Sequence, residues 1–420
     1  MEDKIIVIGA GAAGIGAALE LGNQGVPFEI FEAADRVGGR AYTDRVSLPV
    51  AWDQGCHWMH CADANPLVEW ADRTKTKYSR DDRIEHFKLW ADGDWLNPAE
   101  LETAANQTTK AFEAIYTAAE KGLDVPISDI LPTGSRWTKG ANYIVSLMAS
   151  EDPERVSAAA YGDYLDTEVN WPVTGGYGNL VTAMARDLPV RLNTPVSGLN
   201  EVAQGVEITT AAGKITAKGA IVTASTNVLT SGAIRFGSTQ ASDFVEMLAD
   251  IPCGAYEKVA VSLKSMPSGL DGKMFAMVDP GGDHAPVDFQ ISSDGGPMLI
   301  AHMAGSVARD LAVAGPDAMK DFAAERLNMA FGSGIKAQIT GMAVTSWVTN
   351  PLIRGGYSYS KPGSASLRRI LITAETGRIM FAGEAFSKQW QATAHGAYQS
   401  GRDVAARLAA LIVRAESQRN

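Results

Sequence analysis

The sequence predicts an α/β fold: a doubly wound parallel sheet with a smaller α+β domain inserted into it. Three observations support this prediction. An apolar run at residues 4–8 leads directly into a glycine-rich turn and a helix of small residues. A second glycine turn follows at residues 38–39. Further segments that suit the same sheet are residues 174–252 and 346–420. The first follows a helical stretch at 73–173, and the second follows a mixed stretch at 253–345.

The first glycine turn follows a short, β-branched run, KIIVI, which is typical of a strand covered on both faces. The turn has the pattern G-x-G-x-x-G, formed by Gly9, Gly11 and Gly14. Such glycines permit a tight turn, a close approach of backbone to a pyrophosphate, and close helix–strand packing. Ala12 and Ala13 open the helix, whose N-terminus offers unpaired N–H groups to phosphate.

An acidic residue ends the second predicted strand, at residues 28–31. Glu32 lies 18 residues after Gly14, near the roughly 20 expected for a ribose-binding acid. A carboxylate there suits a free ribose hydroxyl and repels a 2′-phosphate. We therefore expect a Rossmann-like site, with Glu32 and the adjoining Ala33 at the ribose.

The second glycine turn decides between NAD and FAD. Residues 36–40, RVGGR, follow the acid almost directly, and a simple NAD-binding site does not need them. Gly39 brings backbone close, and the Arg40 guanidinium suits bidentate contact with the same pyrophosphate. The sequence therefore predicts FAD.

At this point the chain resembles the flavin-containing amine oxidase family, which includes monoamine, polyamine and amino-acid oxidases. Four further stretches carry the resemblance in the family's order, so that it covers residues 4 to about 410. They are residues 53–60, residues 174–180 with 190–196, residues 251–263, and residues 381–384 with 395–401.

The resemblance implies further cofactor contacts. In the family, residues 190–196 form a strand after a helix and touch the adenine end through the residue at Val196. The segment along the flavin ring and the C-terminal closing motif supply the others: Gly55, Cys56, His57, Trp58, Gly383, Glu384, Thr393, Ala394 and Ala397. Some relatives bind flavin covalently through a cysteine that matches residues 355–357, where this chain has Gly-Gly-Tyr. We therefore expect noncovalent FAD.

The resemblance also implies the chemistry. The carbon next to an amine nitrogen loses hydride to flavin N5, the imine is hydrolysed, and dioxygen reoxidises the flavin and gives hydrogen peroxide. Lys258 matches the lysine that holds a water beside N5. A lysine inside the apolar strand YEKVAVSL is unusual, and the alternative is a side chain that faces solvent. His60 matches a histidine found near the flavin in many polyamine oxidases, and its alternative is a structural role.

The pocket walls depart from the family pattern. Many relatives hold the amine between two aromatic rings. Tyr357 matches the first wall, but Thr393 stands at the second. This difference argues against a standard aromatic monoamine and favours a larger or more polar substrate, unless Trp390 fills the gap.

The domain organisation follows from the same order of motifs. Residues 1–72, 174–252 and 346–420 are predicted to form the FAD-binding domain. Residues 73–173, which have helical periodicity, and 253–345, with strands near 255–263 and 298–303 and a helix at 317–331, are predicted to form the substrate-binding domain.

Composition and charge narrow the kinds of partner and the cellular location that the sequence allows. The net charge of −11 disfavours nucleic acid and indicates either solubility or attraction of a cationic amine. We expect no signal peptide before the first strand, no membrane span, and a packed amphipathic helix at 400–415. The three cysteines, Cys56, Cys61 and Cys253, suggest neither a disulfide framework nor a metal site, and free thiols favour the cytoplasm. Buried inert thiols and a redox role for Cys56 and Cys61 are the alternatives. The sequence also allows a homodimer.

Two other functions are considered beside an amine oxidase. A C–C desaturase related to phytoene desaturase and protoporphyrinogen oxidase would share the N-terminal motif, but Lys258 and the HGAYQSG motif favour an amine. A non-catalytic flavoprotein scaffold has only the incomplete aromatic cage in its favour. Peroxide release on addition of amines distinguishes the three.

Overall fold

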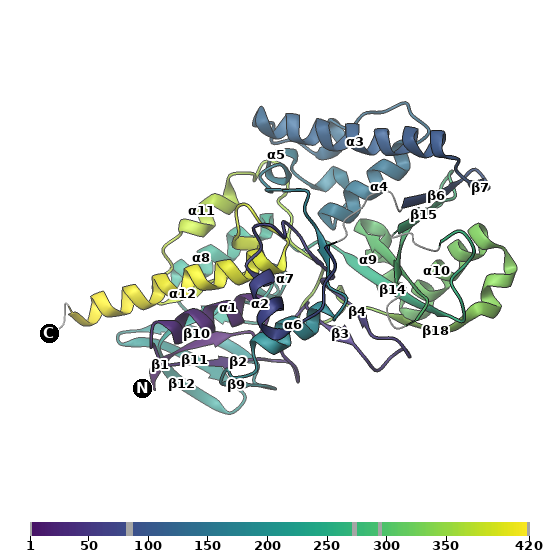
Figure 1. The fold of residues 1–420 in the computed structure, drawn as a ribbon. Coiled ribbons are helices and arrows are strands. Elements are labelled where there is room, and N and C mark those ends of the chain that lie inside the picture. The colour runs from purple at the N-terminus through teal and green to yellow at the C-terminus, as the bar shows by residue number, and fades with distance from the viewer. Residues whose placement is uncertain (1, 81–86, 271–274, 293–295, 418–420) are drawn as a thin grey trace.

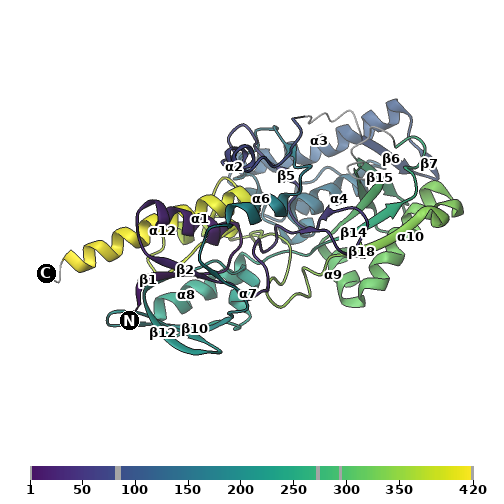
Figure 2. The ribbon, with the colours of Figure 1, turned by 60° about the horizontal axis from the view of Figure 1, so that its bottom comes forward.

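The computed structural model describes residues 2–80, 87–270, 275–292 and 296–417. Within these residues the chain builds two large sheets, which lie in two lobes side by side (Figures 1 and 2). The strands of the first sheet come from residues 2–31, 190–236 and 379–381, and those of the second from 87–95 and 256–344. These strands fall inside the segments predicted for the two domains, whose boundaries stay a prediction.

The first sheet has a parallel core. β1 (Glu2–Ile8) lies between β2 (Phe28–Phe31) and β12 (Gly213–Val222), and both pairings are parallel. β9 (Val190–Arg191) extends this core beyond β2, and β19 (Ile379–Phe381) pairs with the last residues of β12. The parallel core with flanking helices confirms the predicted α/β class.

An antiparallel meander adjoins the parallel core. It consists of β10 (Val196–Val202), β11 (Gly205–Thr210) and the first half of β12, and β13 (Arg235–Phe236) adds a short edge. Residues 190–196, expected as one strand, are therefore divided between β9 and β10, which lie far apart in the sheet. The reason is local: Asn193 has a left-handed backbone (φ +52°), and Pro195 has no N–H for a ladder.

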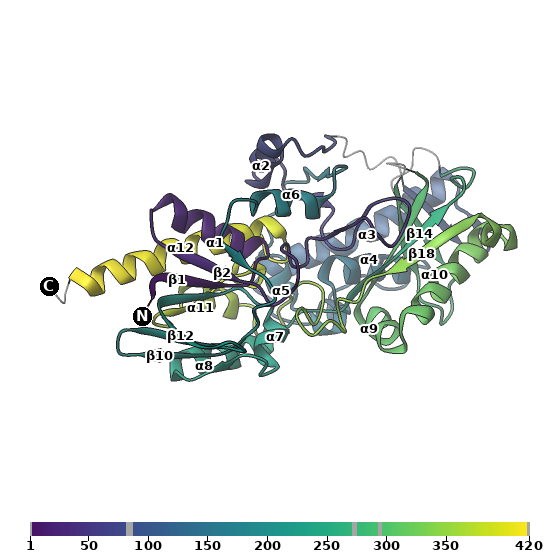
Figure 3. The same cartoon turned by 90° about the horizontal axis from the view of Figure 1, so that it is seen from below.

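Helices cover both faces of this sheet (Figure 3). α1 (Ala12–Asn23) and α12 (Ala394–Ser417) lie side by side on one face and bury Leu21 and Leu408 against Ile5 and Val7. On the other face lie α7 (Thr226–Thr230), α8 (Thr239–Met247) and α11 (Leu367–Thr373). α12 begins six residues before the expected 400, because the Thr393 hydroxyl accepts the Gly396 N–H at 3.0 Å and caps it.

The second sheet is mixed and has seven strands among the described residues. Their order is β18 (Ile339–Val344), β14 (Tyr256–Leu263), β17 (Met298–Ala304), β16 (Val287–Ser292), β15 (Phe275–Asp279), β6 (Phe87–Ala91) and β7 (Asp94–Trp95). α9 (Gly305–Ala314) and α10 (Pro316–Phe331) pack on one face against Val259, Leu299 and Phe289. α4 (Thr138–Ala149) packs on the opposite face and is itself covered by α3 (Pro98–Glu120).

Short elements connect the two lobes. β3 (Thr43–Asp44) pairs with β4 (Trp52–Asp53), and β5 (Trp58–Met59) pairs with β8 (Trp171–Pro172). α2 (Leu67–Thr74) and α6 (Tyr177–Met184) pack together on the first lobe, and α5 (Ala158–Tyr161) joins the α3 core.

None of the helices in the described ranges combines the length and apolar character needed to cross a bilayer.

Candidate active site

The two predicted glycine turns meet at the N-terminus of α1. Gly11 forms an isolated parallel bridge with Gly38, and the Gly38 N–H donates to the Ala10 carbonyl at 2.8 Å. Gly9 has φ +103°, which favours glycine. A Cβ on Gly14 would lie 1.9 Å from the Gly9 oxygen, so only glycine allows α1 to pack this close to β1.

The N-terminus of α12 converges on the same place. Ala12 and Ala13 of α1 pack against Ala394 and Ala397 of α12. A Cβ on Gly401 would lie 1.9 Å from the Ala13 carbonyl oxygen. No side chain in the described part of the chain caps α1, so its first N–H groups stay available to an anion. Small side chains, close backbones and a helix end without a side-chain cap fit the pyrophosphate of a dinucleotide such as FAD.

The glycine turns at residues 9–14 and 38–39, together with the N-termini of α1 and α12, are called the cradle below. Glu32 stabilises this cradle by hydrogen bonds. Its carboxylate accepts the N–H of Ala10, in the first glycine turn, at 2.6 Å. It also accepts the N–H of Ala34, which directly follows Ala33, at 2.8 Å. A carboxylate has about four acceptor positions, so it can still bind a ribose hydroxyl.

Glu384 ties three separate segments together. It accepts from Arg40 at 3.1 Å, from the Ser358 hydroxyl at 2.6 Å and from the Ala392 N–H at 3.0 Å. Arg40 also donates to the Gly356 carbonyl. The second glycine turn, the segment before Tyr357 and the motif that contains Gly383 are thus held as one unit.

Lys258 reaches the segment predicted to run along the flavin. Its Nζ donates to the Gly55 carbonyl at 2.6 Å and to the Asp53 carbonyl at 3.2 Å. The residue is only 4% exposed, so the solvent-facing alternative is wrong. Burial lowers the pKa of this lysine to about 8, against the opposing attraction of Asp53. Its predicted role beside the flavin stays a prediction.

The rest of that segment is packed between the two lobes. The Trp58 ring stacks on Phe275 at 6.2 Å between centroids, and His57 Nδ1 lies 3.4 Å from Asp53 Oδ2.

Burial raises the pKa of the Cys56 thiol, which favours an unreactive protonated side chain. The Cys61 thiol donates to the Leu165 carbonyl at 3.0 Å. These observations favour the inert alternative for both cysteines.

Tyr357 and Thr393, the two predicted pocket walls, are held in different ways. The Tyr357 ring lies 5.5 Å from the Tyr256 ring, and its hydroxyl donates to the Leu147 carbonyl. Thr393 is engaged by its own helix: it caps Gly396 and donates to the Trp390 carbonyl at 2.8 Å. That these two side chains face each other stays a prediction.

His60 and Val196 are two further residues of the predicted site. The His60 side chain is exposed, and its Nδ1 lies 2.8 Å from the Asn170 amide oxygen. Val196 begins β10 and is buried in the core of the first sheet. The structure therefore gives each a structural setting, and their functional roles stay predictions.

The structure adds a row of polar side chains that the sequence reasoning missed. Lys258, His302 and Asp288 are cross-strand neighbours on β14, β17 and β16. His302 Nδ1 lies 2.7 Å from the Tyr256 hydroxyl, and its Nε2 lies 3.2 Å from the Gln290 amide oxygen. The alternation VDFQIS, polar at 288 and 290, was a signal for a strand with one polar face.

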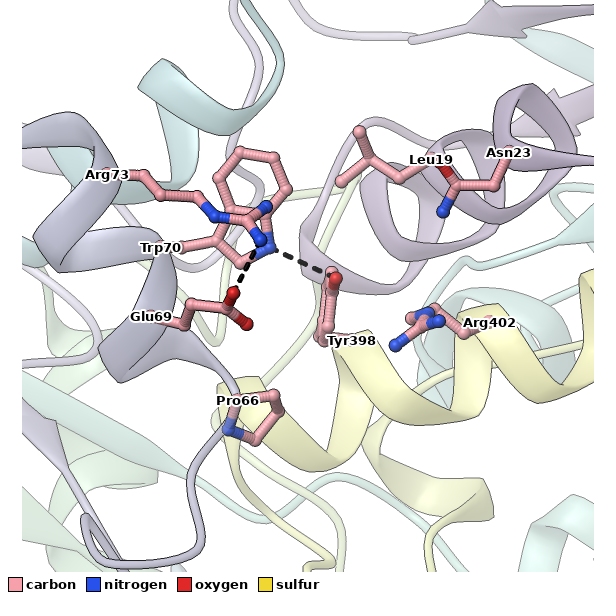
Figure 4. Close-up of a pocket in the computed structure, with 8 residues that line it drawn as sticks. All are labelled: Leu19, Asn23, Pro66, Glu69, Trp70, Arg73, Tyr398 and Arg402. Carbon is pink, nitrogen blue, oxygen red and sulfur yellow. Dashed lines mark hydrogen bonds and ion pairs between the residues drawn. The ribbon is translucent and has the colours of Figure 1, made fainter.

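A separate groove of about 340 Å³ lies on the outer side of α1, α2 and α12 (Figure 4). Trp70 and Tyr398 meet in it through a hydrogen bond of 3.1 Å, beside Arg73 and Arg402. None of the residues predicted for binding or chemistry lines this groove.

The described residues also contain no group of three or more His, Cys, Asp or Glu side chains placed to hold a metal ion.

The parallel sheet and the two glycine turns that meet at the N-terminus of α1 define a dinucleotide-binding protein. The chain belongs to the family of flavin containing amine oxidoreductases, because the family model matches residues 12–136 and 143–409. FAD is the cofactor that this membership and the cradle indicate.

Individual relatives are distant but cover nearly the whole chain. Lysine-specific histone demethylase 2 of Homo sapiens is 25% identical over 97% of this chain, which spans only 53% of that protein. Polyamine oxidase 4 of Oryza sativa subsp. japonica is 27% identical over 95% of the chain and 87% of its own length. The structure of cyclohexylamine oxidase from Brevibacterium oxydans IH-35A shares the fold, with a TM-score of 0.78 at 21% identity and coverage of 97% and 99%.

Proposed function

We propose that this protein is an FAD-dependent amine oxidase. The observation that carries the proposal is the buried ammonium of Lys258, bonded to the carbonyls of Asp53 and Gly55 where the cradle lobe meets the second sheet. FAD bound there would accept hydride from the carbon next to the amine nitrogen. The polar row beside Lys258 favours an amine over the long apolar substrate of a desaturase.

The chain's own groups would bind, orient and desolvate the reactants. The N-terminus of α1, Glu32 and Arg40 would hold FAD at the pyrophosphate and ribose. Tyr256 and Tyr357 would form an aromatic surface for the substrate, and burial would favour the neutral amine that the reaction requires. Burial and the nearby Lys258 keep the pKa of His302 well below its usual value, so this ring is neutral.

The finer features belong to the same proposal. Dioxygen would reoxidise the flavin and give hydrogen peroxide after imine hydrolysis to an aldehyde or ketone. The three cysteines are free, which supports a reducing compartment such as the cytoplasm. A homodimer stays a prediction. The chain covers about half of the histone demethylases it matches, and the proposal does not include their substrates.

The test is anaerobic mixing of the purified yellow protein with a panel of mono-, di- and polyamines. We expect at least one amine to bleach the flavin absorbance, and readmitted air to restore it with release of peroxide. Acid should release FAD into solution, because no cysteine stands at the family's linking position. A panel that leaves the flavin oxidised throughout, with FAD bound, would overturn the proposal.

A second prediction concerns the ribose site. Glu32→Ala should weaken FAD binding by about tenfold or more, because it removes a charged acceptor for Ala10 and Ala34 as well as for ribose, at about 1.5 kcal/mol or more each. The matched control is Glu29→Ala on β2, the strand that Glu32 directly follows; the Glu29 carboxylate pairs with Lys4 and Arg191 instead. Fluorescence titration of the apoprotein with FAD measures both. Equal affinities in the two variants would contradict the assignment of Glu32.

A further inference from the structure

Asp288 is a buried carboxylate on the Lys258 face of the second sheet. Its strand neighbours Val287 and Phe289 pack on the opposite face, against the core beneath α9 and α10. Because side chains alternate along a strand, Asp288 projects from the face that carries Lys258 and His302. It is 6% exposed, so it is withdrawn from bulk solvent.

Within the described ranges, no cationic side chain pairs with this carboxylate. Asp288 Oδ1 has no hydrogen-bond partner within the described part of the chain. Its cross-strand partners on this face are Met277 and His302, and the Tyr143 and Tyr256 hydroxyls lie near it; none of these carries positive charge in the protonation state that burial favours. The buried guanidinium of Arg326 acts on Tyr143, but burial alone shifts the pKa of Asp288. Lys258 stands two strands away, and its ammonium is already bonded to two carbonyls.

Burying an unpaired carboxylate costs free energy, and a bound cation would offset that cost. We propose that Asp288 binds a second cationic nitrogen of the substrate, so that the enzyme prefers diamines and polyamines to monoamines. This inference rests on the proposed amine oxidase function and names the substrate class of that site. The ligand would supply positive charge next to Asp288, which Lys258, two strands away and bonded to two carbonyls, does not provide.

Strand spacing sets the expected length of the substrate. Lys258 and Asp288 are separated by two strand intervals, which is roughly 10 Å at about 4.8 Å each. An amine oxidised beside Lys258 would therefore place a second nitrogen near Asp288 when an extended chain of about eight carbons separates the two nitrogens. A short monoamine would leave Asp288 unpaired.

The preference for a diamine should depend on pH through the charge of Asp288. Burial raises its pKa to about 7, so the carboxylate is present above that value and is lost as the pH falls through it. The facing groups do not titrate in this range: the pKa values of Tyr143 and Tyr256 lie well above it, and that of His302 lies well below. Lys258 titrates near 8, but it serves monoamines and diamines alike.

The experiment compares 1,8-diaminooctane with octylamine on the holoenzyme. Anaerobic stopped-flow gives the second-order rate constant of flavin reduction for each. The wild type should favour the diamine at pH 8 by about tenfold or more, as expected for a charge-assisted contact. Asp288→Asn should remove this preference by lowering the rate constant for the diamine. The control Asp279→Asn changes a buried carboxylate on the adjacent strand that accepts the Gly281 N–H at 3.0 Å, and it should keep the preference.

A binding measurement separates the inference from the proposed function. Octane-1,8-bis(trimethylammonium) and octyltrimethylammonium have no amine lone pair to oxidise, and each can be titrated through its effect on the flavin spectrum. The bis-cation should bind the wild type more tightly than the mono-cation does, and Asp288→Asn should abolish the difference. This result without reduction by any amine would retain the anchor and overturn the oxidase. Reduction by amines with no effect of Asp288→Asn on either ratio would overturn the anchor alone.

Should Asp288→Asn fail to retain FAD, the wild type still decides the question. Its ratio of diamine to octylamine rate constants should fall severalfold between pH 8 and pH 6. A ratio that stays constant over this interval would contradict a binding role for the Asp288 carboxylate.

Discussion

Replacing Lys258 with methionine should leave FAD bound and slow flavin reduction, reoxidation or both by at least about tenfold. Methionine fills the space of the lysine stem but cannot donate to the carbonyls of Gly55 and Asp53. Hydrogen bonds from a buried charged group are worth about 1.5–3 kcal/mol each, which corresponds to roughly ten- to a hundredfold when they position a reacting centre. The segment that contains Asp53 and Gly55 would lose two of the hydrogen bonds that hold it against β14.

Stopped-flow measurement of the two half-reactions between pH 6.5 and 9.5 tests this expectation. The ammonium of Lys258 is present below its pKa of about 8 and is lost above it, so the wild-type rates should change near that pH. The change should be absent in Lys258→Met. Lys264→Met alters an exposed lysine just beyond the end of the same strand and should behave as wild type. Wild-type rates and an unchanged pH profile in Lys258→Met would show that the ammonium has no part in the chemistry.

Gly14→Ala should abolish FAD binding. The new Cβ would lie 1.9 Å from the Gly9 carbonyl oxygen and 2.9 Å from the Gly9 carbonyl carbon. Both contacts are with backbone, which cannot rotate away, so the N-terminus of α1 must move off β1. The N–H groups that face the pyrophosphate would move with it. Purified protein should be colourless, and its thermal midpoint should fall by several degrees.

Gly22→Ala is the matched control at the other end of the same helix. Its Cβ would meet the Phe28 ring at 3.6 Å, an ordinary contact. Alanine is a better helix former than glycine by about 1 kcal/mol, so this variant should keep FAD and be as stable as wild type or slightly more so. Full FAD occupancy in Gly14→Ala would contradict the close helix–strand approach on which the cradle depends.

The local parts of the site were accessible from the sequence because they are contiguous in it. Gly9, Gly11, Gly14 and Glu32 lie within one strand–helix–strand unit, whose spacing follows from the geometry of a single turn and helix. Lys258 stood out because a charged residue interrupts an apolar strand. The parallel core and its family could therefore be predicted before any coordinates were known.

Two expectations about particular segments needed correction. Residues 190–196 do not form one strand, since Asn193 and Pro195 turn the chain between two distant positions in the sheet. The C-terminal helix begins at Ala394 and not at 400, because the hydroxyl of Thr393, which was predicted as a flavin contact and a substituted pocket wall, caps it. In both cases the deciding interaction is a backbone one that residue type alone does not specify.

The sequence by itself determined the two glycine turns and their acidic residue, because these depend on residues close together along the chain. It singled out Lys258, but only the structure decided that this side chain is buried. Only the tertiary structure decided that Lys258, His302 and Asp288 form one row, since they lie on three strands whose pairing depends on register. A shift of one residue in any of these strands would turn its side chain to the opposite face. That register is set by the packing of Val259, Leu299 and Phe289 beneath α9 and α10, which no single segment encodes.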